Sequence, residues 1–184
     1  MKILVDIDST ITNFGEMLLF ANNQLHGTYY EYTDITSYDW FDQTFYTPWK
    51  PTEYQCFWNT VEINPAAVTA VERWIRQGHK VLLVTASHFN DMLGYKIRKT
   101  LEPFNHELVN ERNIVITQDK SIIYGDTMID DYVENLYNFN GIRICHAQPW
   151  NQHYDGSFRF SDWDKINEVI NIIQDIYFED NYIL

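Results

Sequence analysis

Short apolar runs alternate with amphipathic stretches along most of this chain. The runs lie at residues 2–7, 80–87, 113–117, 121–126 with a continuation to 131, and 141–146. Between them, apolar side chains recur at helical spacing over residues 14–25, 65–78, 91–101 and 162–178. Strands that alternate with helices in this order predict an α/β fold, with a parallel sheet flanked by helices and right-handed crossovers.

Residues 28–64 break this alternation. Tyr, Trp and Phe are interspersed here with Asp, Thr and Pro, without the period of a strand. We interpret residues 14–64 as a small helical, aromatic-rich cap inserted after the first strand, and residues 1–13 and 65–184 as the α/β core domain. Most of the rings should pack the core of the cap. A few should face the sheet, because flat rings make good walls for a planar ligand.

Polar side chains that can act in catalysis or metal binding follow several of the predicted strands. They are Asp6 with Asp8, Thr85, Lys120, and Asp130 with Asp131. Parallel strands end at one edge of a sheet, so these groups can converge there on a ligand. Paired carboxylates repel each other unless a cation intervenes, and oxygen ligands suit Mg²⁺. The pattern therefore predicts a magnesium site, with Asp126 as an alternative acid if the strand ends at Gly125.

This set of groups matches the needs of phosphoryl transfer through a carboxylate nucleophile. Asp6 would attack the phosphorus and become phosphorylated. Asp8 would protonate the leaving oxygen and later activate water. Lys120 and Thr85 would hold the phosphoryl oxygens. Asp131, together with Asp6 and the backbone carbonyl of Asp8, would ligate Mg²⁺.

Composition narrows the class of protein further. The chain has 184 residues, 45% of them hydrophobic, and a formal charge of -13, which disfavours a polynucleotide partner. Its apolar runs are shorter than the roughly 18 residues of a membrane span, so we expect no membrane partner and a cytoplasmic location. Cys56 and Cys145 lack the spacing of a zinc site or disulfide framework. We expect His79, His88 and His106 to be surface or loop residues.

The motifs together resemble the haloacid dehalogenase-like phosphatases, whose core is a Rossmann-like sheet. The matching motifs are Asp6-Ile-Asp8-Ser-Thr10, Val-Thr85, Lys120 and Ile-Asp130-Asp131, in the right order across nearly the whole chain. Within that superfamily the chain is most similar to the 5'(3')-deoxyribonucleotidases. That likeness rests on Asp6 to Phe14, Cys56 to Pro65, Asp119-Lys120-Ser121, Met128 to Asp131, Cys145-His146 and a Trp-containing last helix.

The resemblance implies a Mg²⁺-dependent phosphatase acting on nucleoside monophosphates. It also implies that Phe14 and cap rings such as Trp40, Phe41 and Trp58 stack on the base. For the metal it favours Asp131, with Asp130 orienting Lys120 or a water.

The chain departs from the family pattern at several positions. Ser9 stands where the family often has Gly, and Ala86 replaces a Ser that would donate to phosphate, a loss for which Ser87 could compensate. A basic residue common after that motif is missing near Asn90.

Two other functions fit parts of the pattern. A capped phosphatase of the same superfamily could act on a sugar phosphate or another small metabolite, although the aromatic cap favours a planar base. A receiver domain also accepts phosphate on Asp beside Thr, Lys and Mg²⁺, but it has no aromatic insertion. Base preference, the position of the phosphate and the oligomeric state stay open, a homodimer being one option.

Overall fold

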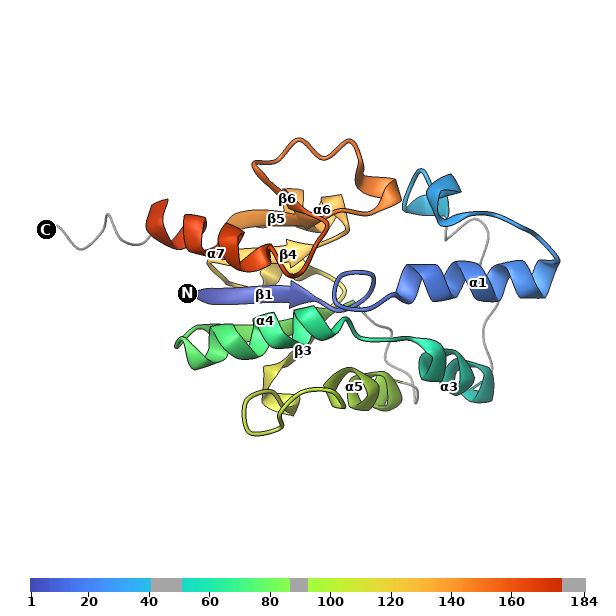
Figure 1. Cartoon of the computed structure of the whole chain (residues 1–184), viewed down its shortest axis with the longest axis horizontal. Coiled ribbons are helices and arrows are strands. Elements are labelled where there is room, and N and C mark those ends of the chain that lie inside the picture. Colours follow the sequence, from blue (N-terminus) through green and yellow to red (C-terminus); the bar gives the residue numbers. More distant parts are fainter. Residues whose placement is uncertain (41–50, 87–92, 177–184) are drawn as a thin grey trace, which may run out of the picture.

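The chain builds a parallel sheet whose strands all end at one edge. The computed structural model describes residues 1–40, 51–86 and 93–176. Within these ranges six strands pair in the order β3-β2-β1-β4-β5-β6, every neighbouring pair parallel (Figure 1). They are β1 (Lys2–Asp6), β2 (Lys80–Thr85), β3 (Ile114–Ile116), β4 (Thr127–Asp130), β5 (Ile142–His146) and β6 (Phe158–Phe160). This is the predicted Rossmann-like α/β fold. Successive strands are added on one side of β1 as far as β3, and from β4 onward on its other side. Open α/β sheets place their ligands at such a switch point, here between β1 and β4.

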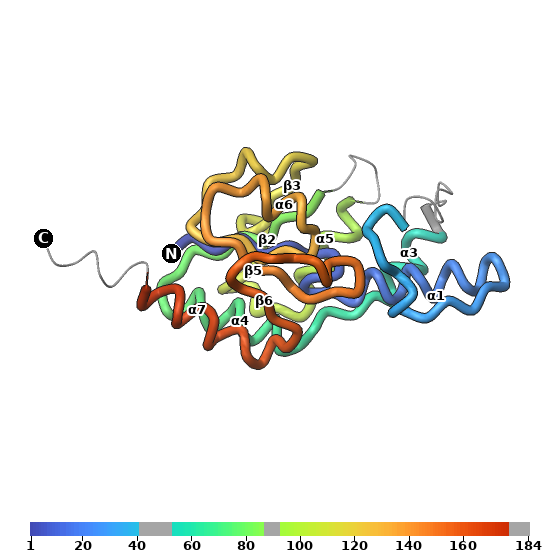
Figure 2. Tube along the Cα trace, turned by 90° about the horizontal axis from the view of Figure 1, so that it is seen from above, coloured from blue at the N-terminus to red at the C-terminus, as the bar shows by residue number. Residues whose placement is uncertain are grey.

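Helices cover both faces of this sheet. Figure 2 shows α4 and α7 on one side and α6 on the other. Helix α1 and helix α3 lie beyond the carboxyl end of β1 (Figure 1). The α-helices are α1 (Phe14–His26), α3 (Pro51–Thr60), α4 (Pro65–Arg76), α5 (Leu93–Leu101), α6 (Val133–Tyr137) and α7 (Ile166–Gln174). Short 3-10 turns are η1 (Tyr32–Asp34), η2 (Glu111–Asn113), η3 (Lys120–Ile122) and η4 (Pro149–Asn151).

Alternation along β1 divides the core into two layers. Ile3, Val5 and Ile7 pack with α4 and α7 in one cluster of buried side chains. Leu4 packs on the opposite face, with Met128 and the α6 side chain Leu136. Asp6 lies on the Leu4 side of the strand because successive side chains point to opposite faces. Burial on both faces explains why β1 is a continuous apolar run rather than an alternating one.

Local sequence signals set most element boundaries as expected. The Asn64 side chain accepts from the backbone N–H groups of Ala66 and Ala67, so α4 begins at Pro65. Helix α1 ends where Gly27 adopts a left-handed conformation, with φ 64°.

Three sequence-based expectations need correction. Residues 121–126 do not form a strand, since the strand in this region begins at Thr127. Asp126 bonds to the first residue of β1, its Oδ2 accepting from the Lys2 backbone N–H at 2.6 Å, so it lies at the opposite edge from Asp6 and is not an alternative site acid. Trp163 precedes the last helix instead of lying on it. The three-residue strand β6 was not predicted at all.

Candidate active site

A lysine joins two buried acids at the switch point of the sheet. Asp6 ends β1 and Asp130 ends β4, and both carboxylates are nearly inaccessible to solvent. The Lys120 ammonium group donates to Asp6 Oδ1 and, at 2.7 Å, to Asp130 Oδ2. Lys120 is itself only 3% exposed, and burial opposes its charge, yet Asp130 and Asp6 raise its pKa above the ordinary range. The structure thus brings together three of the residues expected from the sequence.

Asp131 completes a cluster of three buried carboxylates. One oxygen each of Asp6, Asp130 and Asp131 lies within 4.8 Å of the others. Burial raises the pKa of Asp6 to about 7, with Asp130 and Asp8 adding to the shift and Lys120 opposing it. Burial and the nearby Asp6 and Asp130 raise the pKa of Asp131 well above its usual value. The cluster therefore holds more negative charge than its lysine neutralises, and its hard oxygen donors fit a divalent cation such as Mg²⁺.

Asp130, which ends β4, and Asp131, which follows it, have different partners. Asp130 Oδ2 also accepts from the Asn135 side chain at 3.1 Å, and its Oδ1 accepts from the Tyr132 backbone N–H at 2.9 Å. Asp131 accepts instead from Thr10 Oγ1 at 3.0 Å and from Trp150 Nε1 at 3.1 Å. Asp130 therefore supports Lys120, whereas Asp131 faces the loop that follows β1.

Asp8 belongs to a second cluster, separate from the three carboxylates. Its Oδ2 accepts from the Lys96 ammonium group and, at 3.3 Å, from Thr85 Oγ1. Lys96 also donates to Thr85 Oγ1 at 2.8 Å and lies 5.3 Å from the centre of the Trp58 ring. The other oxygen of Asp8 is buried without a hydrogen-bond partner among the described residues. An unpaired buried carboxylate oxygen is costly, so this atom is available to a ligand.

Lys96 is the main site residue that the sequence analysis missed. It lies on α5 with an exposed fraction of 3%, and it places a cation near the position where none was found around Asn90. The signal was present in the sequence. Lys96 falls three residues after Leu93 and four before Thr100, within the buried stripe of the helix. A lysine in an apolar stripe needs a buried acidic partner, and Asp8 provides it.

The aromatic residues divide between two groups. Phe14 on α1 lies 5.6 Å from Trp58 on α3, ring centre to ring centre, and this pair borders Lys96. Trp40 packs instead with Leu19, Ile35 and Trp150. The structure therefore puts Trp58, which is fully buried, beside the lysine that binds Asp8, and puts Trp40 with the tryptophan that binds Asp131.

Three further residues that the sequence analysis assigned to the site, Ala86, Phe41 and Ser87, have not yet been placed. Ala86 is exposed just after β2. Phe41 and Ser87 lie outside the described residues, as does His88.

Tyr38 is a second residue that the sequence analysis did not assign to the site. Its ring lies 4.1 Å from that of Tyr132, the residue that follows the second acid pair. Burial raises the pKa of the Tyr38 phenol, and the charges of Asp131 and Asp6 raise it further. Tyr38 is thus a neutral hydroxyl close to the carboxylate cluster. Nothing in the spacing of the aromatic segment distinguished it from the neighbouring rings.

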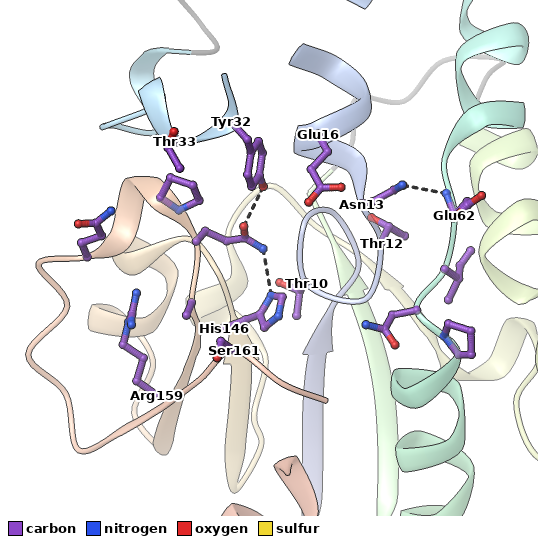
Figure 3. A pocket seen from close by; sticks show the side chains of 17 residues that line it. Thr10, Thr12, Asn13, Glu16, Tyr32, Thr33, Glu62, His146, Arg159 and Ser161 are labelled. Carbon is purple, nitrogen blue, oxygen red and sulfur yellow. Dashed lines mark hydrogen bonds between the residues drawn. The ribbon is translucent and has the colours of Figure 1, made fainter. Parts of the chain in front are cut away.

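A polar cavity of about 1000 Å³ adjoins the loop after β1 (Figure 3). The residues that line it include Thr10, Glu16, Tyr32, His146 and Arg159. They do not include the aspartates of the site, Asp6, Asp8, Asp130 and Asp131. Burial lowers the pKa of His146 to about 4, so this histidine is neutral, and its Nδ1 lies 3.0 Å from the Ser9 carbonyl oxygen. The cavity is therefore distinct from the carboxylate cluster, and Thr10, which lines the cavity and donates to Asp131, connects the two.

Comparison with known proteins assigns this chain to a family. A family model described as "5' nucleotidase, deoxy (Pyrimidine), cytosolic type C protein" (NT5C) matches residues 1–176. The chain belongs to this family. A 5'(3')-deoxyribonucleotidase of Bacillus subtilis is 23% identical over 170 residues, 91% of this chain and 97% of the relative. One from Clostridium acetobutylicum is 26% identical over 121 residues, 65% of this chain and 64% of that protein.

Solved structures agree on the fold. A HAD family hydrolase of Deinococcus radiodurans has a TM-score of 0.63 at 11% identity and covers 93% of this chain and 95% of its own. A HAD phosphatase of Thermococcus onnurineus has a TM-score of 0.56 at 14% identity, covering 92% and 98%. As a member of the NT5C family with this fold, the chain is a phosphoric monoester hydrolase of the 5'-nucleotidase type. The receiver-domain alternative is therefore wrong.

Proposed function

We propose that this NT5C-family protein hydrolyses nucleoside monophosphates, in particular 5'(3')-deoxyribonucleotides, in a Mg²⁺-dependent reaction. The observation that carries the proposal is the division of the two acids of the first motif between two lysines. Asp6 lies with Lys120 and the second acid pair, whereas Asp8 lies with Lys96 and Thr85. Two carboxylates in different environments can take different roles in one reaction.

Asp6 is the proposed nucleophile. Its carboxylate oxygen attacks the phosphorus, the bond from phosphorus to the leaving oxygen breaks, and an aspartyl phosphate forms. Lys120 and Thr85 supply donors for the phosphoryl oxygens. Asp8, protonated on the oxygen that does not bind Lys96, gives this proton to the leaving oxygen and then takes one from the water that hydrolyses the aspartyl phosphate. Lys96 holds the Asp8 side chain in place.

The residues that would hold Mg²⁺ are Asp6, Asp131 and the backbone carbonyl of Asp8, with Asp130 orienting Lys120. The three carboxylates fit a divalent cation because their oxygens are buried and close together. When bound, the ion would screen the negative charge between the carboxylates and the phosphate. Asp130 accepts from the charged Lys120 as well as from Asn135 and the Tyr132 backbone, whereas Asp131 accepts from two neutral donors, Thr10 and Trp150. The Asp131 charge is thus not already paired with a cation, which favours Asp131 as the direct ligand.

We propose that residues 14–64 act as a cap over this site and that their rings contact the nucleobase. Phe14 packs on Trp58, whose ring contacts the Lys96 side chain that binds Asp8. Trp58 is fully buried, so of this pair the partly exposed Phe14 is the ring that can reach a base. Trp40 and Phe41 are further candidates from the sequence. Ala86 and Ser87 follow Thr85 and would offer backbone N–H groups to the phosphate.

We place the protein in the cytoplasm and expect a small-molecule substrate. None of the helices in the described ranges has the length and apolar character of a membrane span. A net charge of -13 argues against a nucleic acid polymer as partner. A homodimer is a further proposal, which light scattering tests directly.

The experiment is a phosphate-release assay on a panel of deoxyribonucleoside, ribonucleoside and sugar monophosphates, with Mg²⁺ or with EDTA. We expect Mg²⁺-dependent release from deoxyribonucleotides and a loss of at least about 10³-fold in Asp6→Asn, because the amide cannot attack phosphorus. Circular dichroism of the variant controls for folding. Faster cleavage of sugar phosphates would contradict the assigned substrate while leaving the role of Asp6 intact. Full activity in Asp6→Asn would overturn the mechanism.

A further inference from the structure

Ser9, the residue that follows Asp8, has an unusual backbone conformation. Its φ is 56°, and among the described residues it is the only non-glycine residue with positive φ. Side chains disfavour this left-handed region, so surrounding contacts must hold it. The backbone N–H of Ser9 donates to Thr12 Oγ1 at 3.2 Å, and the residue is only 6% exposed. The conformation is therefore fixed by the fold around it.

The Ser9 side chain binds the start of α1. Its Oγ accepts from the backbone N–H of Gly15 at 3.0 Å. The first N–H groups of a helix lack partners within the helix, and Asn13, the residue before α1, makes no such bond with its side chain. Ser9 thus caps the N-terminus of α1, although it lies six positions before Gly15. Gly15 allows this close approach, because a Cβ there would lie 3.0 Å from Ser9 Oγ.

The Ser9 carbonyl makes a second connection, to η1. It accepts from Gln148 Nε2 at 2.6 Å. Gln148 Oε1 in turn accepts from the Tyr32 hydroxyl at 2.8 Å, the bond drawn from Tyr32 in Figure 3. Helix α1 is therefore bonded directly to Ser9, and η1 is linked to the same residue through Gln148. That residue lies between Asp8, which binds Lys96, and Thr10, which binds Asp131.

We propose that Ser9 is a positioning residue that orients Asp8 by holding the loop after β1 against the start of α1. The inference rests on the proposed function, because it concerns the proton that Asp8 gives to the leaving oxygen. The bond from the Gly15 N–H to Ser9 Oγ, together with the backbone bonds of Ser9 to Thr12 and Gln148, holds the loop with Asp8 turned toward Lys96 and Thr85. Without the Oγ acceptor the loop is held less firmly and Asp8 loses its orientation. Proton transfer from Asp8 therefore depends on the contact between Ser9 and α1.

Leaving groups of different acidity test this coupling. A nucleoside oxygen needs a proton as its bond to phosphorus breaks, whereas 4-nitrophenolate leaves without one. We expect Ser9→Ala and Ser9→Gly to slow the single-turnover release of nucleoside at least tenfold. Release of 4-nitrophenol from 4-nitrophenyl phosphate should slow less than threefold. Tyr32→Phe should show a smaller effect in the same direction. Ser157→Ala, on an exposed loop, is the matched control and should change neither rate.

The two Ser9 variants separate the side chain from the backbone. Glycine adopts positive φ without strain but lacks the Oγ acceptor, and alanine lacks the acceptor and keeps the strain. Wild-type behaviour of Ser9→Gly would overturn the proposal, since backbone conformation alone would then suffice. Equal slowing with both leaving groups would also overturn it, because a general loss of structure acts on both.

A readout without catalysis separates failure of this inference from failure of the proposed function. If the wild-type protein with Mg²⁺ cleaves neither substrate, the proposed function is wrong and the link to Asp8 chemistry with it. The contact itself is then tested by amide hydrogen exchange. Ser9→Ala and Ser9→Gly should speed exchange at Gly15 at least tenfold relative to Ser157→Ala. Unchanged exchange would show that Ser9 does not hold α1.

Discussion

Asp6 and Asp8 are two positions apart, yet each carboxylate binds a different lysine. Lys120 lies between Asp6 and Asp130, and Lys96 lies between Asp8 and Thr85. The separation gives each acid its own cation and its own set of donors. A single shared lysine would leave the roles of nucleophile and proton donor undistinguished. The presence of Lys96 as a second lysine thus supports the proposal that Asp6 is the nucleophile and Asp8 the proton donor.

Replacing Lys96 tests its part in this division. Lys96→Met keeps most of the side-chain volume but leaves Asp8 with Thr85 as its only described partner. We expect kcat on nucleoside monophosphates to fall about 10²-fold, the lower end of a general acid's contribution, with little change in KM. Stability should fall by about 1–3 kcal/mol, because a carboxylate loses a charged partner.

The control for Lys96→Met lies one turn away on the same helix. Lys99 pairs with Glu102 near the surface, so Lys99→Met should leave kcat unchanged and cost less than about 1 kcal/mol. Steady-state kinetics and urea unfolding measure both variants. An equal loss of kcat in the two would mean that the charge of the helix, not the contact with Asp8, matters.

At the scale of elements, the junction between α1 and the core depends on a close approach. A Cβ on Gly15 would lie 3.0 Å from Ser9 Oγ, 3.0 Å from Trp150 Cη2 and 3.1 Å from the Tyr32 hydroxyl oxygen. The side chains there come from the first loop, η4 and η1. Helix α1 therefore approaches three separate parts of the chain at the one position without a side chain.

A pair of glycine substitutions tests this junction. Gly15→Ala should destabilise the protein by about 1–3 kcal/mol, because the added methyl group overfills the contact. Gly94→Ala on α5 is the matched control, since a Cβ there has no neighbour within 4 Å among the described residues and alanine favours helix. That change should be neutral or stabilising by up to about 1 kcal/mol. Chemical unfolding measures both, and a neutral Gly15→Ala would show that α1 can shift without cost.

The elements that sequence patterns predicted correctly are those whose environment is set locally. Strand β1 is a buried apolar run that ends in an acid, and α4 starts with Asn64 and Pro65. Such signals do not depend on the rest of the fold.

The failures depend on long-range packing. Lys96 falls in the apolar stripe of α5, but its partners Asp8 and Thr85 are distant in the sequence, and β6 has three residues whose pairing with β5 no local pattern requires. The apolar run before Thr127 has the composition of a strand. Pairing with β1 nevertheless begins only at Thr127, which lies opposite Ile3.

At the scale of the whole molecule, the buried acids make stability depend on pH and on metal. Burial raises the pKa of Asp6 to about 7 from an unfolded value near 3.8, and it also raises that of Asp131. Between these values the folded, metal-free protein keeps protons that the unfolded chain has lost. The contribution of these acids to stability therefore falls as pH rises through that window. The proposed Mg²⁺ ion would bind the deprotonated carboxylates, so we expect its affinity to rise over the same range.

The expected result is a larger stabilisation by Mg²⁺ at pH 7.5 than at pH 5.5. At a concentration of about 100 times Kd the gain is about 3 kcal/mol, or roughly 5–10 °C in Tm for a protein of this size. Thermal unfolding with Mg²⁺ and with EDTA at each pH measures the difference, in which the titration of His146 and other distant groups cancels. Asp131→Asn should remove most of it. A gain that is equal at both pH values would contradict binding at this cluster.

The central place of β1 also constrains how the protein is made. Strand β1 leaves the ribosome before both of its partners, which are β2, 78 residues later, and β4, 124 residues later. Trp163 then donates to the carbonyl of Thr10, 153 positions away. Contacts this distant form late, and an apolar strand without its partners is prone to aggregate. Nascent chains stalled before residue 127 should therefore depend on chaperones, with a protease-sensitive β1 that becomes protected only once β4 has emerged.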